Sequence, residues 1–256
     1  MNLRGIEIEF VLKPGTDTNS MTPLEGDTLV KAQVPFRERL ATVLERARER
    51  RIDAFELSGL DNRYPDFPVV GAAKIAAQEV LKIAKRKNHP FKKIMINIQG
   101  ERVMPLFQKT FRGYIEHIEN DLGEEPYYTV DLIIEMPQGI VLIERSNPPY
   151  GWALPGGFID PGEEPKEAAV REAKEETNLE VEQIREFNVY GQPGRDPRFQ
   201  TISTVFIATG VGQAQFGDDA KGLKIIPYPQ LLNGHYAFDH HQIIKDYLAQ
   251  KNPRPA

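Results

Sequence analysis

The 256-residue sequence contains no cysteine. Disulfide bonds, a thiol nucleophile and a zinc site built from cysteines are therefore excluded, and the composition fits a reducing compartment. Runs of lysine or arginine are also missing and the formal net charge is −5, so we expect no nucleic-acid partner. No apolar run approaches the ~18 residues of a membrane span, and the N-terminus has no signal-like pattern. We therefore expect a soluble, cytoplasmic protein that has no membrane partner.

What the chain does contain is a normal globular balance, with 40% apolar and 27% charged residues. Its length is sufficient for two domains, each with a core of its own. The stretch 119–127 is acidic, poor in apolar residues and broken by glycine and proline. We therefore predict a linker at residues 121–126, between a first domain of residues 1–120 and a second of residues 127–256.

The first domain shows strand-like and helix-like patterns in alternation. Such alternation predicts a small α/β domain with parallel strands. Strands are predicted at residues 6–12, 54–57 and 94–98 and, from a weaker pattern, 29–34; helices are predicted at residues 36–50, 70–87 and 103–118.

The second domain has more strands and fewer helices. This ratio predicts an α+β arrangement in which a mixed sheet lies between helices. Its predicted strands are residues 128–135, 140–143, 187–190, 201–208 and 223–226, and its predicted helices are residues 165–177 and 239–249.

The residues with the clearest chemistry lie in the stretch 157–176. Two prolines and a glycine punctuate a tight loop that leads into a helix. In that helix Glu172, Glu175 and Glu176 stand at positions i, i+3 and i+4, so their carboxylates share one face. Like charges at this spacing repel by a few tenths of a kcal/mol per pair, and a divalent cation would reverse the sign of that interaction.

Carboxylate oxygens without cysteine suit Mg²⁺ or Mn²⁺ far better than zinc. Mg²⁺ is usually held by few carboxylates together with substrate phosphates, which indicates phosphate chemistry. Three glutamates on one helical face are by themselves usually only a solvated surface. Six residues at fixed spacing argue otherwise, because chance agreement is on the order of 10⁻⁷ per starting position. They are Gly157, Glu163, Arg171, Glu172, Glu175 and Glu176.

This spacing resembles the Nudix box, and the resemblance covers roughly residues 127–250. It implies an α/β/α sandwich that hydrolyses a pyrophosphate without a covalent intermediate. The implied cofactor is Mg²⁺, with Mn²⁺ as the alternative. The sequence departs from the family at Asn178, where the family has the glycine that ends the helix. Asn tolerates the left-handed conformation next best, so the change is physically mild.

The resemblance also implies roles for individual residues. Glu172 and Glu176 are the expected metal ligands, Glu175 is a further ligand or the base, and the carbonyl of Gly156 is another ligand. Arg171 is expected to orient a glutamate.

Glu163 is expected to fix the loop against the helix through charge-assisted hydrogen bonds. Family members often add an acid from a later loop, and Asp219 or its neighbour Asp218 occupies a comparable position. A turn-forming role for that aspartate is the competing interpretation.

Three stretches outside the box, residues 148–155, 194–198 and 238–241, are similar to stretches of ADP-ribose pyrophosphatases. The resemblance makes ADP-ribose the expected substrate, cleaved to AMP and ribose 5-phosphate. Within the last stretch, Asp239 is well placed as the N-cap of the final helix.

Four side chains of these stretches are candidates for binding the substrate. Arg195 and Arg198 could donate to phosphate or ribose oxygens, and Tyr150 or Trp152 could stack on the base. The alternative is structural: the arginines would pair with Asp196, and Trp152 would lie in the core.

Residues 64–68 and the elements after them weakly resemble the C-terminal half of a macro domain, a domain that binds ADP-ribose. Covering the active site, or forming a homodimer contact, is an equally good expectation for this segment. Two rival functions stay open, a non-catalytic sensor of ADP-ribose or an NAD metabolite and a Nudix hydrolase of a nucleoside triphosphate or dinucleoside polyphosphate. The complete set of box carboxylates favours an enzyme.

Overall fold

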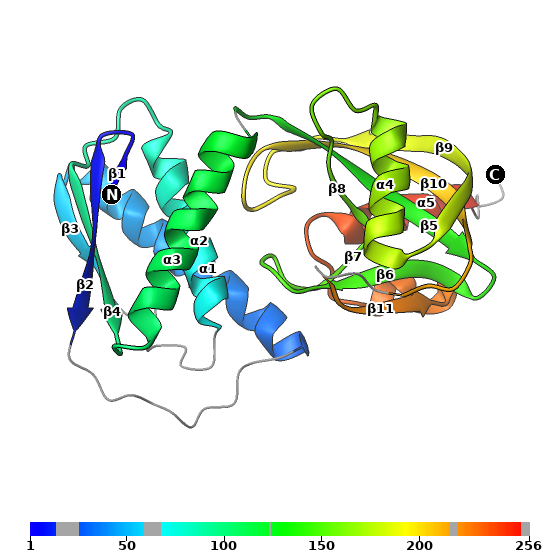
Figure 1. The fold of residues 1–256 in the computed structure, drawn as a ribbon, viewed down its shortest axis with the longest axis horizontal. Coiled ribbons are helices and arrows are strands. Elements are labelled where there is room, and N and C mark those ends of the chain that lie inside the picture. Colours follow the sequence, from blue (N-terminus) through cyan, green and yellow to red (C-terminus); the bar gives the residue numbers. More distant parts are fainter. Residues whose placement is uncertain (14–25, 59–67, 123, 216–219, 252–256) are drawn as a thin grey trace. The chain divides into compact units, whose positions relative to one another are not determined.

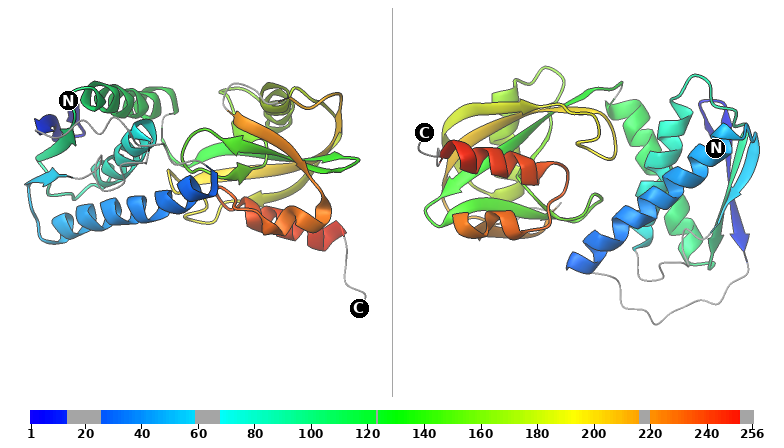
Figure 2. Two further views of the ribbon diagram at one scale, coloured as in Figure 1. Left: turned by 90° about the horizontal axis from the view of Figure 1, so that it is seen from below. Right: turned by 180° about the vertical axis from the view of Figure 1, so that it is seen from behind.

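The computed structural model describes residues 1–13, 26–58, 68–122, 124–215 and 220–251. They form two compact units, Met1–Gly123 and Glu124–Ala256. Figure 1 shows the fold of each unit, and Figure 2 shows the same ribbon from two further sides. In the described part of the chain, none of the helices combines the length and the apolar character of a membrane span.

The first unit is a four-stranded sheet in the order β1-β2-β4-β3, with three helices on one side of it (Figures 1 and 2). β2, β4 and β3 are parallel and β1 is antiparallel to β2, so the predicted α/β class is confirmed. The elements are β1 (Asn2–Leu3), β2 (Ile6–Lys13), α1 (Gly26–Glu49), β3 (Ala54–Leu57), α2 (Val69–Ala84), β4 (Lys93–Gln99) and α3 (Val103–His117).

The alternation of buried and exposed residues explains β2. Ile6 and Ile8 are buried, whereas Glu7 and Glu9, which alternate with them, are exposed, as expected of a strand with one covered face. The strand predicted at residues 29–34 is wrong, because that stretch belongs to α1. Pro35 lies inside this helix, although proline lacks the N–H of a helical hydrogen bond.

The second unit contains a seven-stranded sheet. Its main path runs β11-β6-β5-β10-β9, while β7 pairs with β6 and β8 pairs with β5. Only β5 and β10 run parallel, so the sheet is mixed, as predicted. The strands are β5 (Tyr127–Met136), β6 (Gly139–Arg145), β7 (Trp152–Ala153), β8 (Gly156–Phe158), β9 (Glu180–Tyr190), β10 (Thr201–Val211) and β11 (Ala220–Ile226).

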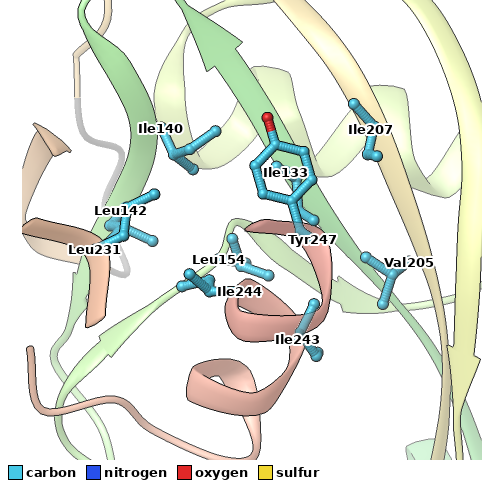
Figure 3. Packing of buried hydrophobic residues seen from close by; sticks show 10 residues of the cluster. All are labelled: Ile133, Ile140, Leu142, Leu154, Val205, Ile207, Leu231, Ile243, Ile244 and Tyr247. Carbon is cyan, nitrogen blue, oxygen red and sulfur yellow. The ribbon is translucent and has the colours of Figure 1, made fainter. Parts of the chain in front are cut away.

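Helices α4 (Pro165–Thr177) and α5 (His240–Lys251) cover the two faces of this sheet. The central strand β5 contributes to both cores because its side chains alternate. Ile133 packs in one apolar cluster with Ile243 and Tyr247 of α5 (Figure 3). Leu132 belongs to the other cluster, which contains Ala169 of α4. The predicted sandwich is therefore confirmed.

Two connections differ from the expectation. A π-helical turn (Ile118–Leu122) continues α3, so part of the acidic stretch expected to be a linker is helical. The strand predicted at residues 187–190 is only the end of β9, whose first seven residues are mostly charged and polar. β9 is an edge strand, where polar side chains are tolerated, and the apolar pattern is therefore weak. A 3₁₀-helix (Tyr228–Asn233) precedes α5.

Candidate active site

Arg171 connects the loop of the 157–176 stretch to helix α4. Its Nε and Nη2 donate to the two carboxylate oxygens of Glu163, each at 2.8 Å. Its Nη1 donates to Glu172 at 2.7 Å and to Glu175 at 3.3 Å, and Nη2 also donates to the carbonyl of Phe158 at 3.0 Å. The hydrogen bonds from Arg171 lower the pKa of Glu163 to about 2. One guanidinium therefore fixes the loop, strand β8 and the glutamate face of α4.

Two glutamates of α4 are held where water is scarce. Glu172 is only 9% exposed, and burial raises the pKa of its carboxyl although Arg171 opposes this. Burial raises the pKa of Glu176 to about 8, against a hydrogen bond from the Gly156 N–H at 2.9 Å. The negative charge of Glu172 adds to that rise. Each carboxylate thus disfavours the charge of the other, and a cation placed between them would favour both charges.

Two glycines allow β8 to lie against both α4 and β5. A Cβ on Gly157 would stand 2.3 Å from Oε1 of Glu172. Gly156 has a φ of +156°, and a Cβ there would stand 2.1 Å from the carbonyl oxygen of Val130 in β5. Gly156 is therefore required for the pairing of β8 with β5, because its Cβ would meet backbone atoms, whereas a Cβ on Gly157 would displace the carboxylate of Glu172.

The donor chemistry of this cluster fits Mg²⁺ or Mn²⁺. Glu172 and Glu176 offer hard oxygens, and Glu175, whose side chain is 58% exposed, offers a third from the solvent side. Over the described residues, no group of three acidic or histidine side chains is already arranged to hold an ion by itself. Asp219, the additional acid expected from a later loop, lies outside the described residues.

The two arginines expected to bind substrate are held by carboxylates. Arg195 donates from Nε and Nη2 to both oxygens of Asp239, at 3.0 and 2.8 Å. Arg198 donates from Nε and Nη2 to Asp196, at 3.0 and 2.7 Å. The carboxylate of Asp239, expected as an N-cap, thus binds Arg195 from the residue just before α5. Both arginines thus form ion pairs within the protein, Arg195 with Asp239 and Arg198 with Asp196. Binding of substrate by either arginine stays a prediction.

The two candidate aromatic residues lie near each other in the chain but in different surroundings. Tyr150 is buried, and this burial raises the pKa of its hydroxyl to about 12. Trp152 is half-buried and packs against the apolar cluster that includes Ile243 and Tyr247 of α5. Nζ of Lys224 lies 4.7 Å from the centroid of the Trp152 ring. Stacking of either ring on a nucleotide base stays a prediction.

Comparison with known proteins places this site in a family. The model of the NUDIX domain matches residues 126–247. An ADP-ribose pyrophosphatase of Methanocaldococcus jannaschii is 46% identical over 130 residues, which cover 50% of this chain and 76% of the relative. This chain belongs to the Nudix hydrolase family. It is therefore an enzyme, as the complete carboxylate set predicts.

Other relatives of this Nudix hydrolase carry different names. A Bacillus subtilis protein named putative 8-oxo-dGTP diphosphatase is 36% identical over 95 residues, covering 36% of this chain and 60% of the relative. Among solved structures, the NUDIX domain of Shewanella oneidensis NrtR in complex with ADP ribose is 27% identical. That match has a TM-score of 0.46 and covers 54% of this chain and 97% of the other.

The one departure from the Nudix box has a clear structural basis. Asn178 follows α4 with a φ of 57°, in the left-handed region that the family glycine would occupy. Its N–H donates to the carbonyl of Lys174 at 2.9 Å, which satisfies one of the last helical acceptors. The substitution therefore keeps the end of this Nudix helix in place.

The sequence did not single out Arg145, at the end of β6, as part of the Nudix site. Its positive charge lowers the pKa of Glu176, in opposition to the larger effect of burial. Cζ of Arg145 lies 4.6 Å from the centroid of the Phe238 ring, and Cζ of Arg198 lies 4.9 Å from the same centroid. Phe238 itself has a left-handed φ of 57°, which is rare for a bulky residue and is often found near functional sites.

The sequence gives only a weak indication that Arg145 lies at the site. It is a charged residue directly after the apolar run of β6, and such residues usually do no more than end a strand at the surface. Its proximity to Glu176 depends on the sheet, because 31 positions separate the two in the sequence. The same holds for Asp131, whose negative charge raises the pKa of Glu176 in addition to burial.

Proposed function

We propose that this Nudix hydrolase cleaves ADP-ribose to AMP and ribose 5-phosphate with Mg²⁺, and that Mn²⁺ can replace Mg²⁺. The convergence of Glu172 and Glu176 on the Gly156–Gly157 backbone supports the metal-dependent chemistry. The ADP-ribose pyrophosphatase of M. jannaschii, at 46% identity over 76% of its length, supports the substrate. The chemistry and the substrate therefore rest on different observations.

The metal site is proposed to consist of the carboxylates of Glu172 and Glu176 and the carbonyl of Gly156, with Glu175 as a further ligand. When bound, the ion would polarise the pyrophosphate and lower the pKa of a water molecule. Arg171 fixes the orientation of Glu172 through the 2.7 Å contact, and Glu163 in turn fixes Arg171. The ligands are thereby held before the substrate arrives, which lowers the cost of ordering them.

A carboxylate must accept the proton of the attacking water, and Glu175 is the candidate base. Its side chain is the most exposed of the four box glutamates, so a proton can pass from it to solvent. Its single contact with Arg171, at 3.3 Å, is longer than the contact that holds Glu172. Glu175 is thus less constrained than Glu172 and can rotate toward a water molecule.

The phosphates of the substrate need positive charge beside the carboxylates. Arg145 supplies it, because its charge acts on Glu176. Arg198, on the same Phe238 ring, would extend this positive charge away from the metal site. Guanidinium groups suit phosphate because they can donate two parallel hydrogen bonds. Arg145 and Arg198 are therefore proposed to hold the diphosphate, while Tyr150 or Trp152 stacks on the base.

A substrate panel tests the proposal. The purified protein is incubated with Mg²⁺ and ADP-ribose, NADH, diadenosine tetraphosphate or 8-oxo-dGTP, and nucleotide release is followed by chromatography. We expect the highest kcat/KM for ADP-ribose, with AMP as the product, and complete loss of turnover when EDTA removes the metal. If another nucleotide ranks far above ADP-ribose, the substrate assignment fails. If turnover persists in EDTA, the metal-dependent mechanism fails.

A further inference from the structure

A buried carboxylate–imidazole pair lies behind the active site. Asp131 of β5 is 7% exposed and His240, the first residue of α5, is 1% exposed. Nε2 of His240 lies 3.2 Å from Oδ1 of Asp131, and its Nδ1 accepts a hydrogen bond of 2.9 Å from the N–H of Leu154. Because Nδ1 is an acceptor, the imidazole is neutral and its proton is on Nε2, which donates to Asp131.

Asp131 is fixed by further contacts on its other oxygen. Oδ2 accepts hydrogen bonds from Oγ of Ser203 at 2.6 Å and from Nη2 of Arg195 at 3.2 Å. Arg195 is itself fixed by Asp239 and by Oγ1 of Thr201. Burial disfavours the charge of Asp131, but the hydrogen bonds from His240 and Ser203 and the positive charge of Arg195 keep its pKa below the usual range. The carboxylate is therefore ionised and has little freedom to move.

This pair is connected to the proposed metal site through the backbone of β8. Asp131 is the cross-strand partner of Gly156 in the β5–β8 ladder. Leu154, held by His240, stands two residues before Gly156. The N–H of Gly156 donates to Glu176, a proposed metal ligand. Asp131, His240 and the segment 154–156 thus form a closed ring of contacts, and Glu176 is attached to it at Gly156.

We propose that Asp131 and His240 are positioning residues, which fix segment 154–156 so that the backbone of Gly156 holds Glu176 in place for the metal ion. This inference rests on the proposed metal-dependent function. It gives Arg195 and Asp239, from two stretches that the sequence associates with substrate, a role in supporting the pair. The competing account is that the network only stabilises the fold, and the two accounts differ in what they predict for metal binding.

Two substitutions of His240 separate its two hydrogen bonds. His240→Asn keeps an acceptor near the position of Nδ1 for Leu154 and loses the contact with Asp131. His240→Gln keeps a donor near the position of Nε2 and loses the acceptor for Leu154. Tyr247→Phe is the matched control, because it removes a side-chain hydrogen bond to Glu135 from the same helix and leaves the hydrogen bonds of the Leu154 and Gly156 N–H groups in place.

Three measurements on each protein give the test. Amide hydrogen exchange of Gly156 in the metal-free protein reports the position of the segment. Mn²⁺ binding by electron paramagnetic resonance reports the site without any substrate, and thermal unfolding reports stability. We expect both His240 variants to lose protection at Gly156 and to bind Mn²⁺ about 10-fold more weakly or worse. Tyr247→Phe is expected to lower only the Tm.

The proposal is overturned if the His240 variants lower the Tm but keep the Mn²⁺ affinity and the Gly156 protection of the wild type. Should both variants fail to fold, Ser203→Ala provides the same test, because it removes one contact of Asp131 with little change in volume. Weaker Mn²⁺ binding by Ser203→Ala supports the proposal, and wild-type binding overturns it. A wrong substrate leaves this test intact, whereas a wild-type protein without an Mn²⁺ site sinks both the inference and the proposed function.

Discussion

At the scale of single residues, the proposed active site depends on side chains that hold other side chains. Arg171 donates hydrogen bonds to three glutamates and a backbone carbonyl. Glu172 and Glu176 are partly withdrawn from water, so their charges are costly until a cation arrives. The contacts of Arg171 and the burial of Glu176 each have a measurable consequence.

Replacing Arg171 by lysine should impair metal binding. Lysine keeps the charge but cannot donate two parallel bonds to Glu163 while also reaching Glu172. We expect Arg171→Lys to raise the Mg²⁺ concentration for half-maximal activity, or to lower kcat, by about 10- to 100-fold. Lys174→Gln on the same helix, which removes an exposed ion pair with Glu180 of β9, is the control and should change activity little. Equal effects of the two substitutions would refute the role of Arg171.

The raised pKa of Glu176 predicts a pH-dependent stability of the metal-free protein. The folded pKa of about 8 lies above the ordinary value of 4.5, so the native state binds the proton more tightly than the unfolded state. Its contribution to stability is present below about pH 4.5 and is lost as the pH rises through about 8. Urea unfolding in EDTA should therefore show wild type losing stability relative to Glu176→Gln over this range. A pH-independent difference between the two proteins would contradict the prediction.

At the scale of elements, the proposed site lies where helix α4 contacts the short strand β8. Helix α4 begins at Pro165 after a capping box formed by Glu164 and Glu167, and it ends at Thr177, as the sequence predicts. Strand β8 comprises only three residues and was not predicted, because so short a segment has no periodicity. The position of β8 depends instead on its pairing with β5.

The close approach of β8 to α4 predicts a large functional effect of one methyl group. In Gly157→Ala the new Cβ would stand 2.3 Å from Oε1 of Glu172 and would displace a carboxylate that Arg171 holds. We expect Mg²⁺-dependent turnover to fall at least about 10-fold while the Tm changes little. Gly191→Ala, whose Cβ would meet only Ile202 at 3.4 Å, is the control. Normal Mg²⁺ activation of Gly157→Ala would refute this geometry.

At the scale of the whole molecule, each of the two units has its own buried residues and its own sheet. The site residues discussed above all belong to the unit Glu124–Ala256. We therefore expect a fragment of residues 124–256 to fold cooperatively and to keep Mg²⁺-dependent hydrolysis within a few-fold of the full chain. A fragment that begins at residue 134 lacks most of β5 and should not fold. Loss of activity in the first fragment, if it still folds, would show that residues 1–123 contribute to catalysis.

The sequence by itself determined the features that depend on short separations along the chain. The i, i+3, i+4 glutamates, the loop before α4 and its left-handed end at Asn178 follow from local geometry, which repeats wherever a helix forms. The same is true of the division of the chain into an α/β part and a part with a mixed sheet. Only the tertiary structure brought together Asp131 and His240, Arg145 and Phe238, and Gly156 and Glu176. Those pairs depend on strand register and on helix packing, and residues 20 to 109 positions apart leave no periodic trace of a contact in the sequence.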